Sequence, residues 1–140
     1  MAVGCEKLKD AANTVTGTIT GIDSTYAGTW NVDANKSNFN LSGSYITINE
    51  DGSMDFYYGK DKKTLKYPST SILKAGSMYI ATYNETDPNN SNVVVNKYIV
   101  NISFEETTNA DSTTTTVANV SYSIESDLEG NTLKGVFNLQ

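Results

Sequence analysis

The sequence predicts an all-β protein, built as a single antiparallel up-and-down β-barrel of eight or nine strands. Threonine, serine, asparagine and nine tyrosines are frequent among its 140 residues, a composition typical of pleated sheets. From Ala27 onward, apolar and polar residues alternate with a period of two and are interrupted by turn residues, and no segment shows an amphipathic helical period of useful length. Closure removes unpaired sheet edges and therefore favours the barrel, with a two-layer β-sandwich as the alternative.

The alternation is clearest in the C-terminal half of the chain. Between residues 93 and 105 the even positions are expected to point inward, and they hold Val94, Asn96, Tyr98, Val100, Ile102 and Phe104. The same parity recurs between residues 113 and 125, where the inward residues are Ala118, Val120, Tyr122 and Ile124. The last segment places inward Leu133, Gly135, Phe137 and Leu139. With turns at 109–111 and 129–131, three consecutive antiparallel strands are predicted.

A hairpin is predicted in the N-terminal half. Ser44, Ile46 and Ile48 alternate before Glu50-Asp51-Gly52, and Met54, Phe56 and Tyr58 alternate after it. Asp-Gly supplies the positive φ values that a tight turn needs. Further strands are expected at residues 27–33, 63–67, 71–74 and 77–83, with a loop at 87–90. We expect residues 1–26 to form an N-terminal tether and residues 27–140 to form the barrel domain.

The composition argues against several classes of function. The net charge is -6 and every basic residue is a lysine, so the chain is expected to repel nucleic acid and lacks arginine for reading it. Histidine is absent, which excludes a Ser-His-Asp or Cys-His site and removes the commonest metal ligand. Asp87, Asn89 and Ser91 have calcium-loop spacing, but the later glycine and glutamate are missing. We therefore expect no enzymatic activity, no cofactor and no metal.

The single cysteine, Cys5, follows Ala2-Val3-Gly4 near the start of the chain. Small residues before a cysteine are typical of the end of a bacterial lipobox, in which that cysteine becomes the acylated first residue of the mature protein. Two or more acyl chains hold a protein stably at a membrane, since each buried CH₂ contributes about 0.8 kcal/mol. We expect Cys5 to be the lipidation site, and a free surface thiol is the alternative.

Gly28-Thr29-Trp30 resembles the Gly-x-Trp motif that opens the first barrel strand of lipocalins and related calycins. Small bacterial envelope lipoproteins have a similar outline, which here comprises Cys5, Gly28-Thr29-Trp30 and the segment from Tyr45 to Gly52. The resemblance implies a lipocalin-like barrel, anchored by lipid at the outer membrane or cell surface of a bacterium. The lipocalin tryptophan is covered by an arginine near the C-terminus. This chain has none, and Lys134 is the candidate to replace it.

These features predict a lipoprotein whose barrel binds a small, partly apolar ligand inside the cup or at its mouth. From inward parity, the interior residues are Trp30, Ile46, Ile48, Met54, Phe56, Tyr98, Val100, Phe104, Tyr122 and Phe137. An eight-stranded barrel either fills with its own side chains or holds one small ligand. The alternative is a non-enzymatic surface module that binds another protein through the polar loops at 84–92 and 107–112.

Overall fold

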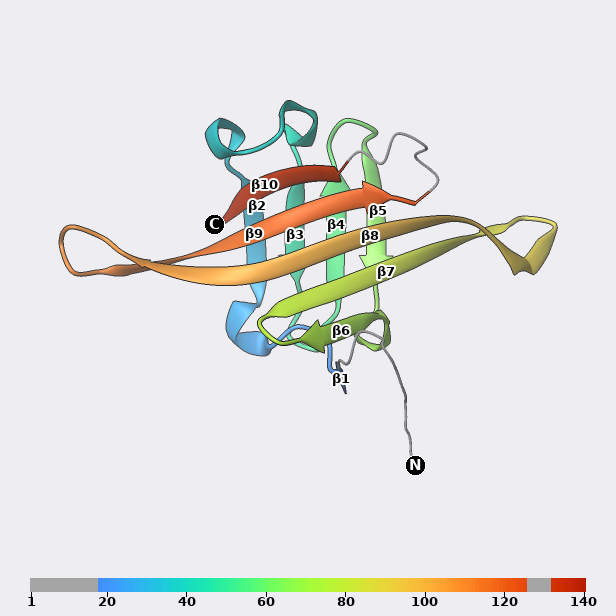
Figure 1. Ribbon diagram of the computed structural model, residues 1–140, viewed down its shortest axis with the longest axis horizontal. Helices are drawn as coiled ribbons and strands as arrows, with labels where there is room; N and C mark the ends of the chain where they lie inside the picture. The colour runs from blue at the N-terminus through green and yellow to red at the C-terminus, as the bar shows by residue number, and fades with distance from the viewer. Residues whose placement is uncertain (1–17, 126–131) are drawn as a thin grey trace.

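A computed structural model describes residues 18–125 and 132–140, and this part of the chain is all-β. Its strands form one ten-stranded antiparallel sheet in the order β1-β6-β7-β8-β9-β10-β2-β3-β4-β5 (Figure 1). The strands are β1 Thr18–Ile19, β2 Gly28–Val32, β3 Tyr45–Ile48, β4 Met54–Tyr58, β5 Lys63–Tyr67, β6 Ile72–Ala75, β7 Met78–Asp87, β8 Asn90–Thr108, β9 Thr114–Ile124 and β10 Thr132–Leu139. Short 3₁₀ turns connect them: η2 Ser24–Tyr26, η3 Ala34–Lys36, η4 Phe39–Leu41 and η5 Ser69–Ser71.

The sheet bends over itself into a half-barrel. Strands β2 to β5 run behind β7 to β9 and cross them at a steep angle (Figure 1). The two layers belong to one sheet because β10 pairs with β2, with Phe137 opposite Val32 and Leu139 opposite Trp30. The all-β fold and the meander of antiparallel strands are confirmed. The described part has ten strands where eight or nine were predicted, and it does not consist of the two separate sheets of a sandwich.

The two edges of the curved sheet, β5 and β1, are not paired with each other. Pro68 directly follows β5, and proline has no N–H to donate to a sheet ladder. The chain then makes the η5 turn and continues as β6 on the far side of the opening. The sheet is therefore not closed into a barrel by backbone hydrogen bonds between β5, which precedes Pro68, and β6, which follows it.

Side chains bridge this opening instead of backbone hydrogen bonds. The hydroxyl of Tyr67, on β5, donates to the carbonyl oxygen of Tyr98, on β8, at 3.2 Å. The Tyr67 ring also meets the Tyr83 ring edge-on, with 6.2 Å between centroids. Lys63 Nζ donates to Tyr98 Oη at 3.2 Å and lies 3.9 Å from Glu85 Oε2. These contacts, which we call the tyrosine seam, join β5 to β7 and β8.

The core fills the space between the crossing layers. Trp30 is 1% exposed, and its indole N–H donates to the carbonyl oxygen of Tyr26 at 2.9 Å. Phe104 covers the indole, with 5.2 Å between ring centroids, and Tyr26 stacks on Phe104 at 3.7 Å. Lys134 is exposed on the strand whose inward positions are Gly135 and Phe137, so the expected cover over Trp30 is supplied by an aromatic side chain instead.

Some residues before Ala27, where the barrel domain was expected to begin, belong to the sheet and its core. Thr18 and Ile19 of β1 pair with β6, and Ile22 is buried in the core, although residues 1–26 were expected to be a tether. The predicted hairpin around Glu50-Asp51-Gly52 is confirmed, with β3 paired to β4 and Gly52 at a φ of 90°. Two positions predicted to face inward, Val94 and Leu139, are exposed: Val94 lies in the part of β8 that is exposed on both faces, and Leu139 is the last residue of β10.

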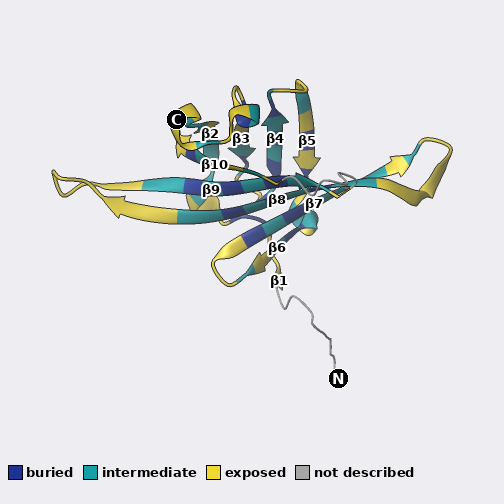
Figure 2. Ribbon diagram, turned by 45° about the horizontal axis from the view of Figure 1, so that its top comes forward, coloured by how far each residue is buried: buried dark blue, intermediate teal, exposed yellow. Residues whose placement is uncertain are grey.

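Strands β7 and β8 are longer than predicted, and together with β9 they project past the core as two hairpins in opposite directions (Figure 1). We call residues 84–97 the valine arm and residues 105–116 the threonine arm. Burial is confined to the middle of these strands, and both ends are exposed (Figure 2). The polar loop predicted at 84–92 is therefore largely strand, whereas the loop predicted at 107–112 is mostly the turn between β8 and β9, with only Thr107 and Thr108 in β8. The alternation of apolar and polar residues could not indicate how far these strands extend, because a strand that is exposed on both faces does not need an apolar residue at every second position.

Trp30→Ala is expected to lower the free energy of unfolding by about 3–5 kcal/mol, because it removes a fully buried large side chain. Urea unfolding followed by circular dichroism measures the change. Phe39→Ala is the matched control, since Phe39 is 86% exposed and its loss should change stability by less than about 0.5 kcal/mol. Equal effects from the two substitutions would contradict the packing described here.

Stability is expected to fall as the pH rises above 10. Burial, with smaller contributions from Tyr122, Tyr83 and Tyr98, raises the pKa of Tyr67 above its ordinary value of 10.0. Above that pH the unfolded chain releases a proton that the folded chain keeps, so each such group lowers the free energy of unfolding by about 1.4 kcal/mol per pH unit. Below pH 10 both states are protonated and the contribution is intact.

Tyr67→Phe tests this assignment. The variant should lose about 1 kcal/mol at pH 8, from the missing hydrogen bond to Tyr98, and its stability should fall less steeply than that of the wild type between pH 10 and 11. Urea unfolding at each pH measures both effects. The same slope in variant and wild type would show that Tyr67 does not carry the alkaline sensitivity.

Candidate functional site

The structure brings the predicted interior residues together on the concave face of the half-barrel. Trp30, Met54, Phe56, Val100 and Phe137 are each at most 1% exposed. They belong to one core cluster, which also contains Ile46, Ile48, Tyr98 and Tyr122 and has Phe104 packed against it. These side chains contact one another, as in the Phe56–Tyr122 pair with ring centroids 4.9 Å apart. As placed here, they form the packed core.

Two of the predicted residues reach the ends of this core. Phe104 is half-buried and lines a surface hollow beside η2, and Tyr122 lines another beside η4. The η2 turn and the β6–β7 turn lie at one end of the half-barrel, while η4 and the β4–β5 turn lie at the other (Figure 1). The predicted mouth therefore corresponds to two rim hollows at opposite ends.

The η2 rim hollow has a volume of about 270 Å³. Its lining combines three aromatic rings with polar and charged groups and consists of Asp23, Thr25, Tyr26, Lys74, Gly76, Ser77, Tyr79 and Phe104. The rings of Tyr26 and Phe104 are parallel to within 2°, and the Tyr79 ring meets Phe104 edge-on at 6.1 Å. The aromatic wall is thus held by stacking and by the packing of Phe104 on Trp30.

The polar groups of this hollow have fixed positions. Asp23 caps η2, where its Oδ1 accepts a hydrogen bond from the Thr25 N–H at 2.8 Å. The hydrogen bonds from Thr25 lower the pKa of Asp23, and the Lys74 ammonium acts in the same direction. Lys74 Nζ lies 5.7 Å from the centroid of the Tyr79 ring, and Tyr79 Oη accepts from the Asp23 N–H at 3.3 Å. A carboxylate and an ammonium group therefore flank the aromatic wall.

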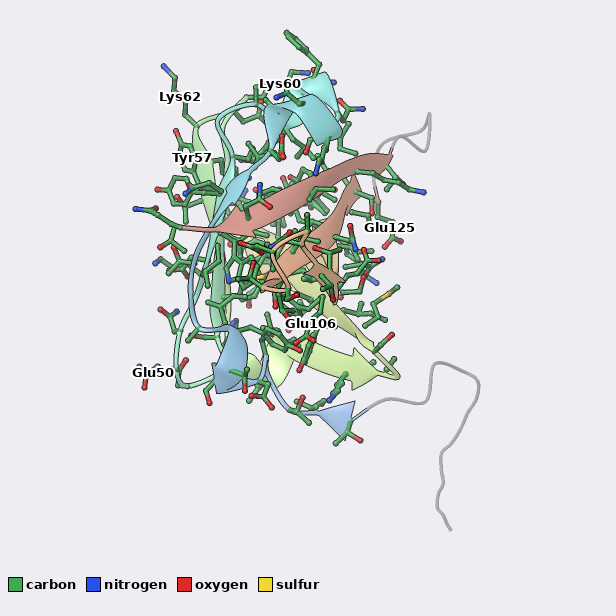
Figure 3. All side chains as sticks on the ribbon, turned by 90° about the vertical axis from the view of Figure 1, so that its left-hand side faces the viewer. Glu50, Tyr57, Lys60, Lys62, Glu106 and Glu125 are labelled. Atoms are coloured by element: carbon green, nitrogen blue, oxygen red, sulfur yellow. The ribbon has the colours of Figure 1, made fainter. Side chains whose placement is uncertain are left out.

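The η4 rim hollow is smaller, about 220 Å³, and is lined by Asn40, Tyr58, Lys60, Asp61, Tyr122, Ser123, Ile124 and Leu133. Tyr58 and Tyr122 face each other with ring centroids 5.0 Å apart, and burial raises the pKa of both hydroxyls. Lys60 and Lys62 lie at this end of the molecule, whereas Glu50 lies at the other (Figure 3). Less aromatic surface is available here, because both tyrosines are buried.

Sequence reasoning missed the residues that complete the η2 rim hollow. Tyr26 and Asp23 fall in the segment expected to be a tether, and Lys74 and Ser77 were expected only as parts of strands. A candidate signal was Asp23-Ser24-Thr25, since aspartate two residues before an N–H donor favours a turn. Nothing in the local pattern places that turn against Phe104, 78 or more residues away along the chain.

The outward residues show no comparable grouping of rings within the described ranges, apart from the stacked pair Tyr45 and Tyr57 on the back layer. The Tyr57 side chain points away from the core, opposite to its neighbour Tyr58 (Figure 3). Asp87 and Asn89 form a turn in which Asp87 Oδ1 accepts from the Asn89 N–H at 2.8 Å. Among residues 18–125 and 132–140 we find no cluster of three or more potential metal ligands.

Cys5 lies outside the described residues, so its predicted lipidation stays a prediction. In the part of the chain that the structure describes, no helix has the length and apolar character to span a membrane. Comparisons with protein-family models, with curated proteins and with solved structures find no match to this chain.

Proposed function

We propose that this protein binds a small, partly apolar molecule at the η2 rim hollow. The observation that carries the proposal is the aromatic wall of the hollow, which consists of the half-buried rings of Tyr26 and Phe104 and the buried ring of Tyr79. Asp23 and Lys74 flank this wall. Small-molecule sites typically combine apolar and aromatic walls with a few fixed polar groups. About 270 Å³ is close to the lower end of their usual size.

The lining indicates which ligand would fit. A flat apolar ring or ring edge would pack on the aromatic wall, while hydroxyl or amine donors of the ligand would meet the Asp23 carboxylate. The Lys74 ammonium would donate a hydrogen bond to a ligand oxygen, and Thr25 and Ser77 add hydroxyl groups. The core residues beneath, Trp30 above all, would keep the wall rigid and so lower the entropy cost of binding.

The lipocalin-like barrel and the bacterial lipoprotein belong to the same proposal. Its support is the resemblance around Gly28-Thr29-Trp30, the small residues before Cys5 and an up-and-down order of strands. A chain acylated at Cys5 would display the half-barrel at the outer membrane or cell surface of a bacterium. We propose binding without catalysis, because the chain lacks histidine, the side chain that most often acts as a general base near neutral pH.

A second candidate function is protein binding through the valine arm. Val93, Val94 and Val95 are 44%, 45% and 50% exposed on a hairpin that projects beyond the core (Figure 2). Three consecutive exposed valines on a strand are unusual for a surface that contacts only water. This observation favours the surface module, although the projecting element is a hairpin of strand residues where a polar loop was expected.

Tyr26→Ser is expected to weaken binding of the fluorescent probe 1-anilinonaphthalene-8-sulfonate by about 5- to 30-fold, since an aromatic contact contributes about 1–2 kcal/mol. Lys74→Ala is also expected to weaken probe binding, because it removes the ammonium group that would pair with the sulfonate. Tyr57→Ser is the matched control, a half-buried tyrosine whose side chain points away from the core. Fluorescence titration gives the affinities, and equal affinity in the Tyr26 and Tyr57 variants would exclude this hollow as the probe site.

Cys5 is expected to carry acyl chains in protein produced with its own secretion signal in a bacterial host. Intact mass spectrometry of the membrane fraction measures the added mass, and Cys5→Ser should move the protein out of that fraction. An unmodified Cys5 in protein recovered free of membranes would remove the anchor from the proposal.

A further inference from the structure

We propose that the valine arm pairs edge to edge with the same arm of a second copy of this chain, through the segment Asn92-Val93-Val94-Val95-Asn96. The proposal rests on the second candidate function, protein binding through this arm, and names its partner. It is independent of the η2 rim hollow, because none of the residues that line that hollow belongs to the valine arm.

The outer edge of this segment carries no neighbouring strand in the described part of the sheet. Strand β9 pairs with β8 only as far as Tyr98, which lies opposite Ile124, and the Glu125 N–H then donates to the Lys97 carbonyl oxygen at 2.9 Å. Toward the arm tip, β8 is paired on one side only, with β7. An unpaired strand edge presents N–H and C=O groups that can template another strand.

Pairing on the β7 side is itself irregular. Register shifts separate Glu85 from Thr86 and Thr86 from Asp87, so Val95 and residues 91–93 have no Cα partner in β7. Bulges of this kind leave residues without ladder partners and bend the strand. The segment with three exposed valines is therefore also the least paired part of β8, and a second strand would both cover the valines and satisfy backbone groups.

The threonine arm provides an internal comparison. It also projects from the core as a hairpin, but its pairing is regular from Glu105 opposite Val117 to Thr108 opposite Thr114. None of the large hydrophobic residues found to be exposed lies between residues 105 and 116. Large exposed apolar residues are thus found on the valine arm and not on the threonine arm. Projection from the core, which both hairpins share, does not explain the exposed valines.

The segment is self-complementary in an antiparallel pair. Its order, Asn-Val-Val-Val-Asn, is the same read in either direction. About a twofold axis at Val94, Val94 faces its own copy, Val93 faces Val95, and Asn92 faces Asn96, so apolar side chains oppose apolar ones at every central position. No charged residue lies in the segment, so the acidic residues that give each chain its net charge of -6 do not face each other within the paired strands.

The pairing is limited to about five residues from each copy, because Glu125 occupies the edge next to Lys97. Stable interfaces use about 20–30 residues on each side, so the dimer is expected to be weak and to depend on protein concentration. Salt should strengthen it by screening the repulsion between two acidic chains and favouring apolar burial.

Engineered cysteines test the register in the full chain carrying Cys5→Ser. Opposed residues of an antiparallel pair lie about 4.5–5.5 Å apart between Cα atoms, within reach of a disulfide, whereas residues two positions off register lie about 7–8 Å apart and are not. Val94→Cys should form a disulfide dimer with itself at least about tenfold faster than Val93→Cys, Val95→Cys or the threonine-arm control Thr115→Cys. A mixture of Val93→Cys and Val95→Cys should form the mixed disulfide preferentially.

The oxidation rates are measured by non-reducing mass spectrometry, and the unmodified chain is followed by sedimentation over a range of concentrations. Val94→Lys should abolish association by placing two ammonium groups at the twofold axis, while the exposed control Thr115→Lys should not. Association that survives Val94→Lys, or a Val94→Cys dimer that forms no faster than the Thr115→Cys dimer, would overturn the self-pairing.

A photo-crosslinking residue placed at position 94 separates this proposal from the candidate function on which it rests. Adducts between two copies of the chain in producing cells support both. Adducts with other proteins, together with a purified chain that stays monomeric, would overturn self-pairing and leave protein binding by the arm in place. The lack of any adduct above that of the same probe at position 115 would overturn both.

Discussion

The structure depends on one sheet burying its concave face against itself. Strands β2 to β5 and β7 to β10 cross with their apolar faces toward each other, and the crossing region holds the largest buried side chains, including Trp30, Tyr67 and Phe56. Burial of apolar surface is the main favourable contribution to folding, and no α-helix or second sheet in the described part covers this face. Each layer is therefore the cover of the other.

Because the edges of this sheet are not paired by backbone hydrogen bonds, the side-chain contacts of the tyrosine seam hold β5 next to β7 and β8. A side-chain bridge has fewer and longer contacts than a strand ladder, and it fixes β5 against β7 and β8 only near Tyr67 and Lys63. Most of the seam is tyrosine, whose ring contributes apolar contact while its hydroxyl satisfies polar groups at the border of the core. The exposed Lys63–Glu85 pair adds little by itself, since surface ion pairs are screened by water.

The same constraint produces both candidate sites. Where the crossing layers end, aromatic residues at the border of the core line the two rim hollows, half-buried Phe104 in one and buried Tyr122 in the other. Where β7, β8 and β9 run past the crossing, their inner face has no opposite layer, and this creates the two arms. The proposed small-molecule site at the η2 rim hollow and the proposed protein-binding site on the valine arm thus both lie where the core ends, at two different places.

The sequence by itself determined the strands that lie over the core and the direction of their side chains. Tyr98, Val100, Ile102, Ala118, Val120 and Phe137 are buried as their parity predicted, because a strand with one buried and one wet face records that burial with a period of two. Asp51-Gly52 likewise identified its hairpin, because the positive φ of a tight turn is a local requirement.

Only the tertiary structure decided how far the strands extend, where the sheet opens and what surrounds Trp30. Val94 continues the inward parity but lies on an arm with no opposite layer, and Tyr26 reaches Phe104 from a segment without any strand pattern. Pro68 marks the end of β5, yet its position alone does not specify that side chains bridge the gap to β7 and β8. These features depend on contacts between residues that are far apart in the chain. The period of a strand predicts which of its own faces is buried, but not which other segment covers that face.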